Sequence, residues 1–150
     1  MTLVLIRPIT PTIAIGDQPS AAELQSLPVE GYVAIVNLRN DGEPDQPLST
    51  AAEGEQARSF GMQYHHYGVG GRPLDAASVQ AVCDFIDQHS AAGKVLVHCR
   101  KGPRAAAIVL VQQARANGWS ADEAIEHGAT MGLAVDHNMR AMILPLLQGE

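Results

Sequence analysis

Cysteine is scarce in this 150-residue chain, which contains only Cys83 and Cys99. Two cysteines form at most one disulfide, far below the density of a small secreted scaffold, so we expect free thiols. The beginning of the chain also lacks a long apolar run, because residues 3–6 are followed at once by Arg7 and Pro8. Four apolar residues are too few for a signal sequence or a membrane span. These features predict a cytoplasmic protein without a membrane partner.

Basic residues are outnumbered, with 10 Lys and Arg against 16 Asp and Glu and a net charge of −6 at pH 7. Nucleic acids and anionic membranes attract wide positive surfaces, so this balance argues against both as partners. Charged residues make up 17% of the chain and apolar residues 46%. That content can bury one substantial core, and we predict a single domain over residues 1–150.

Short apolar strands alternate with helix starts along the chain. Strands are predicted at residues 11–16, 32–38, 62–69 and 94–99. The last is apolar on both faces, as expected for the centre of a parallel sheet that is covered by helices. The alternation predicts an α/β sandwich with a central, mainly parallel sheet flanked by helices.

Helix-capping residues mark the predicted helix starts. Capping boxes or N-cap residues occur at residues 20–23, 50–53, 75, 120–123 and 136. The helix from residue 50 should stop at Gly61, and a helix over residues 105–116 should end at Asn117 and Gly118. The helix after Asp75 places its apolar side chains on one face, namely Val79, Val82, Cys83, Phe85 and Ile86.

The stretch HCRKGPR, residues 98–104, joins a predicted strand to a predicted helix. Ligands of parallel α/β sheets bind at the carboxyl ends of strands, and a helix N-terminus offers unpaired N–H groups to an anion. Arg100 and Lys101 add positive charge, and Gly102 lets the backbone bend close to the ligand. The planar guanidinium of Arg104 suits a tetrahedral oxyanion. We predict an anion-binding cradle formed by this turn.

Cys99 lies where this turn begins. Thiols with a pKa near 8.5 fall to roughly 3.5–7.5 beside a helix N-terminus and cationic side chains, which makes them nucleophilic at neutral pH. A cysteine that closes a buried strand is more often a small core residue, and we interpret Cys83 in that way. The combination of strand, glycine turn, arginine and helix favours a nucleophile at Cys99. His98 is expected to order the turn by hydrogen bonding.

The segment HCRKGPR is similar to the His-Cys-x-x-Gly-x-Arg loop of cysteine phosphatases and rhodaneses. Together with IAIGDQPSAAEL, IVNLRNDGE, YHHYGV and VLVHCRKGPRAA, it resembles the phosphatase-like domain of beta-lactamase-hydrolase-like proteins over residues 10–115. The resemblance implies a dual-specificity-phosphatase-like fold. It also implies that Cys99 is the nucleophile and Arg104 the anion ligand.

The loop departs from the familiar tyrosine phosphatases. Four residues separate Cys99 from Arg104, as in rhodaneses, whereas those phosphatases have five. Pro103 has no N–H to donate to the cradle, although it belongs to the predicted anion-binding turn. Ala105 stands where those phosphatases carry a hydroxyl.

The general acid of the tyrosine phosphatases has no clear counterpart. The corresponding segment, residues 68–75, offers Gly70 and Gly71, and Asp75 is better interpreted as a helix cap. Residues 37–45 follow a strand at the same sheet edge, where Arg39 is predicted to bind the anion and Glu43 could line the site. Asp41 is our candidate acid, although Asp-Gly is also a common turn pair.

Three functions fit these residues. The favoured one is a cysteine-dependent phosphatase that hydrolyses phosphate monoesters, with phosphotyrosine as one candidate, through a phosphocysteine intermediate. The alternatives are a sulfurtransferase that carries a persulfide on Cys99 and a non-catalytic anion-binding module. The partner would be a small phosphorylated or sulfur-containing substrate or a phosphoprotein. We expect no cofactor and no metal, since the adjacent His65 and His66 point to opposite sides of a strand.

Overall fold

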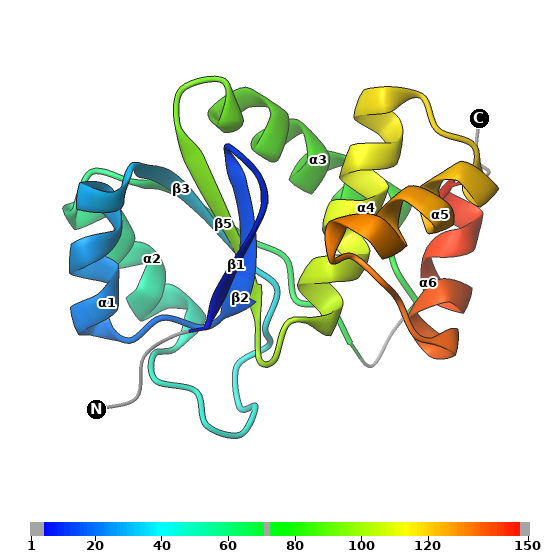
Figure 1. Cartoon of the computed structure of the whole chain (residues 1–150). Coiled ribbons are helices and arrows are strands. Elements are labelled where there is room, and N and C mark those ends of the chain that lie inside the picture. Colours follow the sequence, from blue (N-terminus) through cyan, green and yellow to red (C-terminus); the bar gives the residue numbers. More distant parts are fainter. Residues whose placement is uncertain (1–4, 71–72, 148–150) are drawn as a thin grey trace.

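The computed structural model describes residues 5–70 and 73–147 and contains a five-stranded sheet (Figure 1). Its strands are β1 (Ile6–Thr10), β2 (Ile13–Asp17), β3 (Tyr32–Asn37), β4 (Gln63–His66) and β5 (Lys94–Cys99). Their spatial order is β1-β2-β5-β3-β4, and every neighbouring pair is parallel except β1 with β2. The apolar strand β5 is central, so the predicted α/β sandwich with a mainly parallel sheet is confirmed.

Helices cover both faces of this sheet. The helices are α1 (Ala21–Ser26), the 3₁₀ helix η1 (Leu27–Glu30), α2 (Thr50–Ser59), α3 (Ala76–Ser90), α4 (Pro103–Asn117), α5 (Ala121–Met131) and α6 (His137–Leu147). Figure 1 shows α1 and α2 on one face and α3 and α4 on the other, with α5 and α6 packed outside α4. In the described parts of the chain, no helix is long and apolar enough to cross a membrane.

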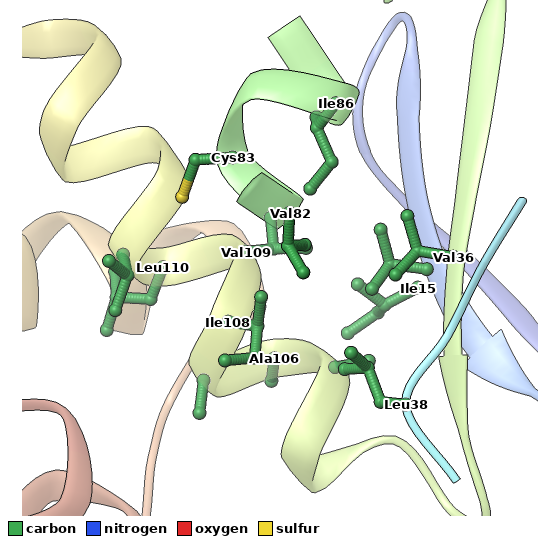
Figure 2. Packing of buried hydrophobic residues seen from close by; sticks show 14 of the residues in the cluster. Ile15, Val36, Leu38, Val82, Cys83, Ile86, Ala106, Ile108, Val109 and Leu110 are labelled. Carbon is green, nitrogen blue, oxygen red and sulfur yellow. The ribbon is translucent and has the colours of Figure 1, made fainter. Parts of the chain in front are cut away.

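Side chains of each strand alternate between two cores. Ile15, Val36 and Val97 face α3 and α4, and Figure 2 shows Ile15, Val36 and Leu38 beside the side chains of these helices. On the other face, the cluster that includes Ile35 and Leu96 packs against α1, η1 and α2. Consecutive residues at the end of a strand therefore reach different layers, which decides what surrounds His98 and Cys99.

Most predicted helix starts and ends are present. The N-cap side chains of Ser20, Asp75, Ser120 and Asp136 each accept from a backbone N–H three residues on. Helix α4 ends at Gly118, which has a left-handed φ of 68°. It begins at Pro103, two residues earlier than predicted, because proline is well suited to the first helical position.

Two other sequence predictions need correction, and one strand is absent from the predictions. The capping box at residues 50–53 is wrong, because Ser49 is the N-cap of α2 and the Glu53 side chain is buried elsewhere. The strand predicted at residues 62–69 shortens to β4. The antiparallel edge strand β1 was not predicted from its sequence. Its pairing with β2 shifts register between Pro8 and Thr10.

Candidate active site

Cys99 ends the central strand β5, and Arg104 lies in the first turn of α4 that follows. Gly102 links them with a φ of 103°, a left-handed conformation that favours glycine. Its backbone N–H donates to Cys99 Sγ at 3.0 Å. The structure therefore brings the thiol, the glycine turn and the helix start together as the sequence predicts. Cys99 itself is fully buried.

The Arg104 guanidinium is held from one side. Nη1 donates to Glu43 Oε2 at 2.9 Å and to the Val69 carbonyl at 2.9 Å, and Nη2 donates to Glu43 Oε1 at 2.8 Å. The bond to Glu43 raises the pKa of Arg104, and the nearby Cys99 sulfur acts in the same direction. In the described structure these bonds do not use Nε. The Cys99 sulfur also lies within hydrogen-bonding reach of the Arg104 guanidinium.

Glu43 joins this arginine to the loop after β3. Its carboxylate also accepts from Arg39 Nε at 3.2 Å and from the Asn40 backbone N–H at 2.7 Å. The hydrogen bond from Arg104 is the main reason that the pKa of Glu43 falls to about 2. Sequence reasoning placed Glu43 only among residues that could line the site. Its pairing with a residue 61 positions away left no local signal.

Arg39 does not bind an anion as predicted. Its side chain is only 1% exposed and donates within the protein to Glu43, Gln18, Pro44 and Asp45. These hydrogen bonds occupy the guanidinium donors of Arg39 with partners inside the protein. Arg39 therefore shapes the loop that carries Glu43.

The other basic residues of the turn lie nearer the surface. Arg100 Nη2 donates to Asp45 Oδ2 at 2.8 Å, so a second carboxylate of the same loop pairs with the turn. That bond lowers the pKa of Asp45. Lys101 is exposed, as is Pro103. Arg100 and Lys101 thus contribute positive charge at the rim of the site.

His98 points to the opposite face of the sheet from Cys99. Its Nε2 lies 2.6 Å from Glu53 Oε2, and both side chains are fully buried. Gln18 Nε2 donates to Glu53 Oε1 at 2.9 Å, while Gln18 Oε1 accepts from Arg39. The expectation that His98 orders the turn by its side chain is therefore wrong, because strand alternation directs it toward α2.

The Asp41 carboxylate binds the start of α2 and not the basic turn. Its Oδ1 accepts from the Thr50 backbone N–H at 2.8 Å and its Oδ2 from the Thr50 hydroxyl at 3.0 Å. The backbone bond is the main reason that the pKa of Asp41 is lowered. Asp75 caps α3 as predicted, and Gly71 lies outside the described residues. These contacts give Asp41 and Asp75 structural roles at helix starts.

Solved phosphatase structures share this fold. Tk-PTP in its active form matches with a TM-score of 0.77, 19% identity and coverage of 97% of both chains. PTPMT1 in complex with PI(5)P matches with a TM-score of 0.76, 15% identity and coverage of 94% of this chain and 93% of that one. P. aeruginosa TpbA matches with a TM-score of 0.67, 18% identity and coverage of 94% and 82%. The chain therefore has a phosphatase fold of the tyrosine and dual-specificity class.

Sequence comparison narrows this class. The family described as "Beta-lactamase hydrolase-like protein, phosphatase-like domain" matches residues 5–116. Beta-lactamase hydrolase-like protein of Xylella fastidiosa (strain Temecula1) is 35% identical over 128 residues, which cover 82% of this chain and 29% of that protein. The Agrobacterium fabrum (strain C58) relative is 34% identical over 103 residues, with coverage of 68% and 23%. The chain belongs to this family, and it matches less than a third of the length of these relatives.

The buried His98–Glu53 pair predicts that two glutamates of α2 contribute very differently to the free energy of unfolding. Glu53→Ala should lower the free energy of unfolding by about 3–5 kcal/mol, because it leaves His98 buried without its partner. Glu55 is exposed on the same helix, so Glu55→Ala should change stability far less. Urea denaturation of both variants measures the difference, and equal losses would contradict a stabilising pair.

The environment of Glu43 predicts how stability responds to acid. Its pKa is about 2 in the folded protein, against an ordinary value of 4.5 for a glutamate, so its contribution to stability is complete above pH 4.5 and is lost as the pH falls toward 2. Glu43→Gln should lower the stability at pH 7 by about 1–3 kcal/mol. It should also flatten the loss of stability between pH 4.5 and 2.

Denaturation curves at several pH values test this response. Glu126→Gln is a matched control, because Glu126 is exposed on α5. The control should follow the acid dependence of the wild-type protein. A Glu43→Gln protein with that same dependence would show that the ion pair does not contribute.

The two thiols should differ in reactivity. Burial raises the pKa of Cys83 to about 11, so this thiol is neutral at pH 7. Cys99 accepts the Gly102 N–H and lies beside the Arg104 guanidinium. Both thiols are buried, so brief treatment with iodoacetamide at pH 7 compares their surroundings and should alkylate Cys99 much faster than Cys83, as measured by mass spectrometry. Equal rates would argue against an activated thiol at Cys99.

Proposed function

We propose that this chain is a cysteine-dependent phosphatase that hydrolyses phosphate monoesters through a phosphocysteine intermediate. The observation that carries the proposal is the placement of Cys99 Sγ between the Gly102 N–H and the guanidinium of Arg104. A thiolate at the end of β5 can attack phosphorus, while the arginine and the start of α4 stabilise charge on the equatorial oxygens.

The fixed position of Arg104 supports this reaction. A bidentate clamp works only when the planar guanidinium is held in the correct orientation, and Glu43 with the Val69 carbonyl supplies that restraint. In the first step, Cys99 Sγ forms a bond to phosphorus as the bond to the ester oxygen breaks. In the second, water attacks phosphorus and the Cys99 thiolate leaves.

Ligands of structural relatives agree with this substrate class. A cysteine-to-serine variant of TpbA holds pTyr, and PTPMT1 holds PI(5)P. Both ligands are phosphate monoesters, although their organic parts differ. The shared fold supports a phosphate monoester as the substrate of this chain, either on a small molecule or on a phosphoprotein.

A sulfurtransferase is the second candidate because four residues separate Cys99 from Arg104. A shorter loop makes a smaller cradle, as in the rhodaneses that it resembles. In this reaction Cys99 would take sulfane sulfur from a donor such as thiosulfate and transfer it to an acceptor such as cyanide.

Parallel assays separate these functions. The wild-type protein should hydrolyse p-nitrophenyl phosphate, and Cys99→Ser should abolish the reaction. Arg104→Lys should lower kcat/KM by about 10²–10³-fold, because a point charge does not reproduce a bidentate clamp. Arg115 lies on the exposed side of α4, and Arg115→Lys should retain wild-type turnover.

An assay with thiosulfate tests the sulfurtransferase. Wild-type protein incubated with thiosulfate should show no added sulfur on Cys99 by mass spectrometry. A Cys99 persulfide together with no turnover of p-nitrophenyl phosphate would overturn the phosphatase and support the sulfurtransferase. Tight binding of phosphate without either reaction would indicate an anion-binding module.

A further inference from the structure

Most acidic side chains near the candidate active site are already committed to a partner. The pairs are Asp41 with Thr50, Glu43 with Arg104, Asp45 with Arg100, Glu53 with His98 and Asp75 with Ser78. Hydrogen bonds lower the pKa of four of these carboxyls, at residues 41, 43, 45 and 75. A carboxyl that is held ionised is a poor proton donor at neutral pH.

Asp17 differs from all of these acids. It ends β2 and is only partly buried. In the described parts of the chain, its carboxylate accepts no hydrogen bond and forms no ion pair, while its backbone N–H donates to the Leu5 carbonyl at 3.0 Å. Its side chain is therefore available at the edge of the sheet where the reaction would take place.

Strand register places Asp17 beside the nucleophile. Strands β2 and β5 are parallel, and Asp17 is the direct partner of Cys99. Neighbouring strands lie about 4.7–4.9 Å apart, and partner residues project from the same face of a sheet. Ile15 and Val97, two residues earlier on each strand, share the core that faces α4. Asp17 and Cys99 continue these two rows to the carboxyl edge.

Few charged groups surround Asp17 in the described structure. On β5, Cys99 shares its face, while His98 points to the other face and pairs with Glu53. On β1, Arg7 donates to the Gly132 carbonyl. At the start of α4, Arg104 is bound to Glu43. In the described parts of the chain, neither Arg7 nor Arg104 donates a hydrogen bond to the Asp17 carboxylate.

We propose that Asp17 is the proton donor for the leaving group, an inference that rests on the proposed phosphatase function. When Cys99 Sγ bonds to phosphorus and the ester P–O bond breaks, the departing oxygen takes the Asp17 proton and leaves as an alcohol. The Asp17 carboxylate then accepts a proton from the attacking water as the S–P bond breaks. Phosphate, the thiolate and the protonated carboxyl result.

Two aryl phosphates with different leaving groups test this role. Phenyl phosphate needs a proton on its leaving oxygen far more than p-nitrophenyl phosphate does. Asp17→Asn should therefore lower kcat for phenyl phosphate by about 10²–10⁴-fold and affect p-nitrophenyl phosphate much less. The fall in rate at high pH, which reports loss of the donor proton, should disappear in this variant.

Matched variants complete the experiment. Asp84 is exposed on α3 and accepts from Gln80 through Oδ1, so Asp84→Asn should keep the wild-type ratio of the two rates. Asp41→Asn should also keep that ratio. Asp17→Ser provides a second removal of the acid, and thermal melting shows whether each variant is folded.

The outcomes separate this proposal from the function on which it rests. An unchanged ratio of rates in folded Asp17→Asn and Asp17→Ser, or a selective loss in Asp41→Asn, would overturn the role of Asp17 and leave the phosphatase intact. If the wild-type protein hydrolyses neither ester, the proposed function fails and the proton donor fails with it.

Discussion

The bidentate ion pair between Glu43 and Arg104 connects the two segments that build the candidate active site. One is the loop after β3, and the other is the first turn of α4. This pair fixes the orientation of Arg104. The guanidinium also interacts with the Cys99 sulfur. The same carboxylate accepts from Arg39 and from the Asn40 backbone, so the loop itself depends on it. Charge-assisted hydrogen bonds are stronger than those between neutral groups, and the bidentate geometry adds specificity.

A buried polar network continues from this loop to the opposite face of the sheet. Arg39 donates to Gln18, Gln18 donates to Glu53, and Glu53 lies 2.6 Å from His98. Such networks are costly when only partly satisfied, because a buried charge without a partner is poorly solvated. The network links β2, the loop after β3, α2 and β5, which are the elements that position the basic turn. His98 thus supports the fold beneath Cys99.

The fold and the family of this chain are phosphatase-like, while its basic turn differs locally from that of the familiar tyrosine phosphatases. The chain shares the phosphatase fold with structures that are less than 20% identical. Its loop is one residue shorter than that of the familiar tyrosine phosphatases and contains Pro103 in place of a donor. The proposed anion cradle therefore relies on one well-held arginine and on the start of α4. The two carboxylates of the loop after β3 balance the positive charge of the turn.

Features that depend on neighbouring residues can be predicted from the sequence alone. These include the helix caps at Ser20, Asp75 and Ser120, the apolar central strand β5, and the strand-glycine-helix turn that carries Cys99 and Arg104, since each involves groups only a few positions apart. Contacts between groups that are distant in sequence depend on how the elements pack in three dimensions. Glu43 and Arg104 are 61 positions apart and His98 and Glu53 are 45 apart, so no local pattern could pair them. Arg39 points inward because it donates to Gln18, 21 positions away, as well as to its neighbours in the loop after β3. Asp17 lies beside Cys99 because the register of two parallel strands, which is set by the packing of both sheet faces, brings the ends of β2 and β5 together.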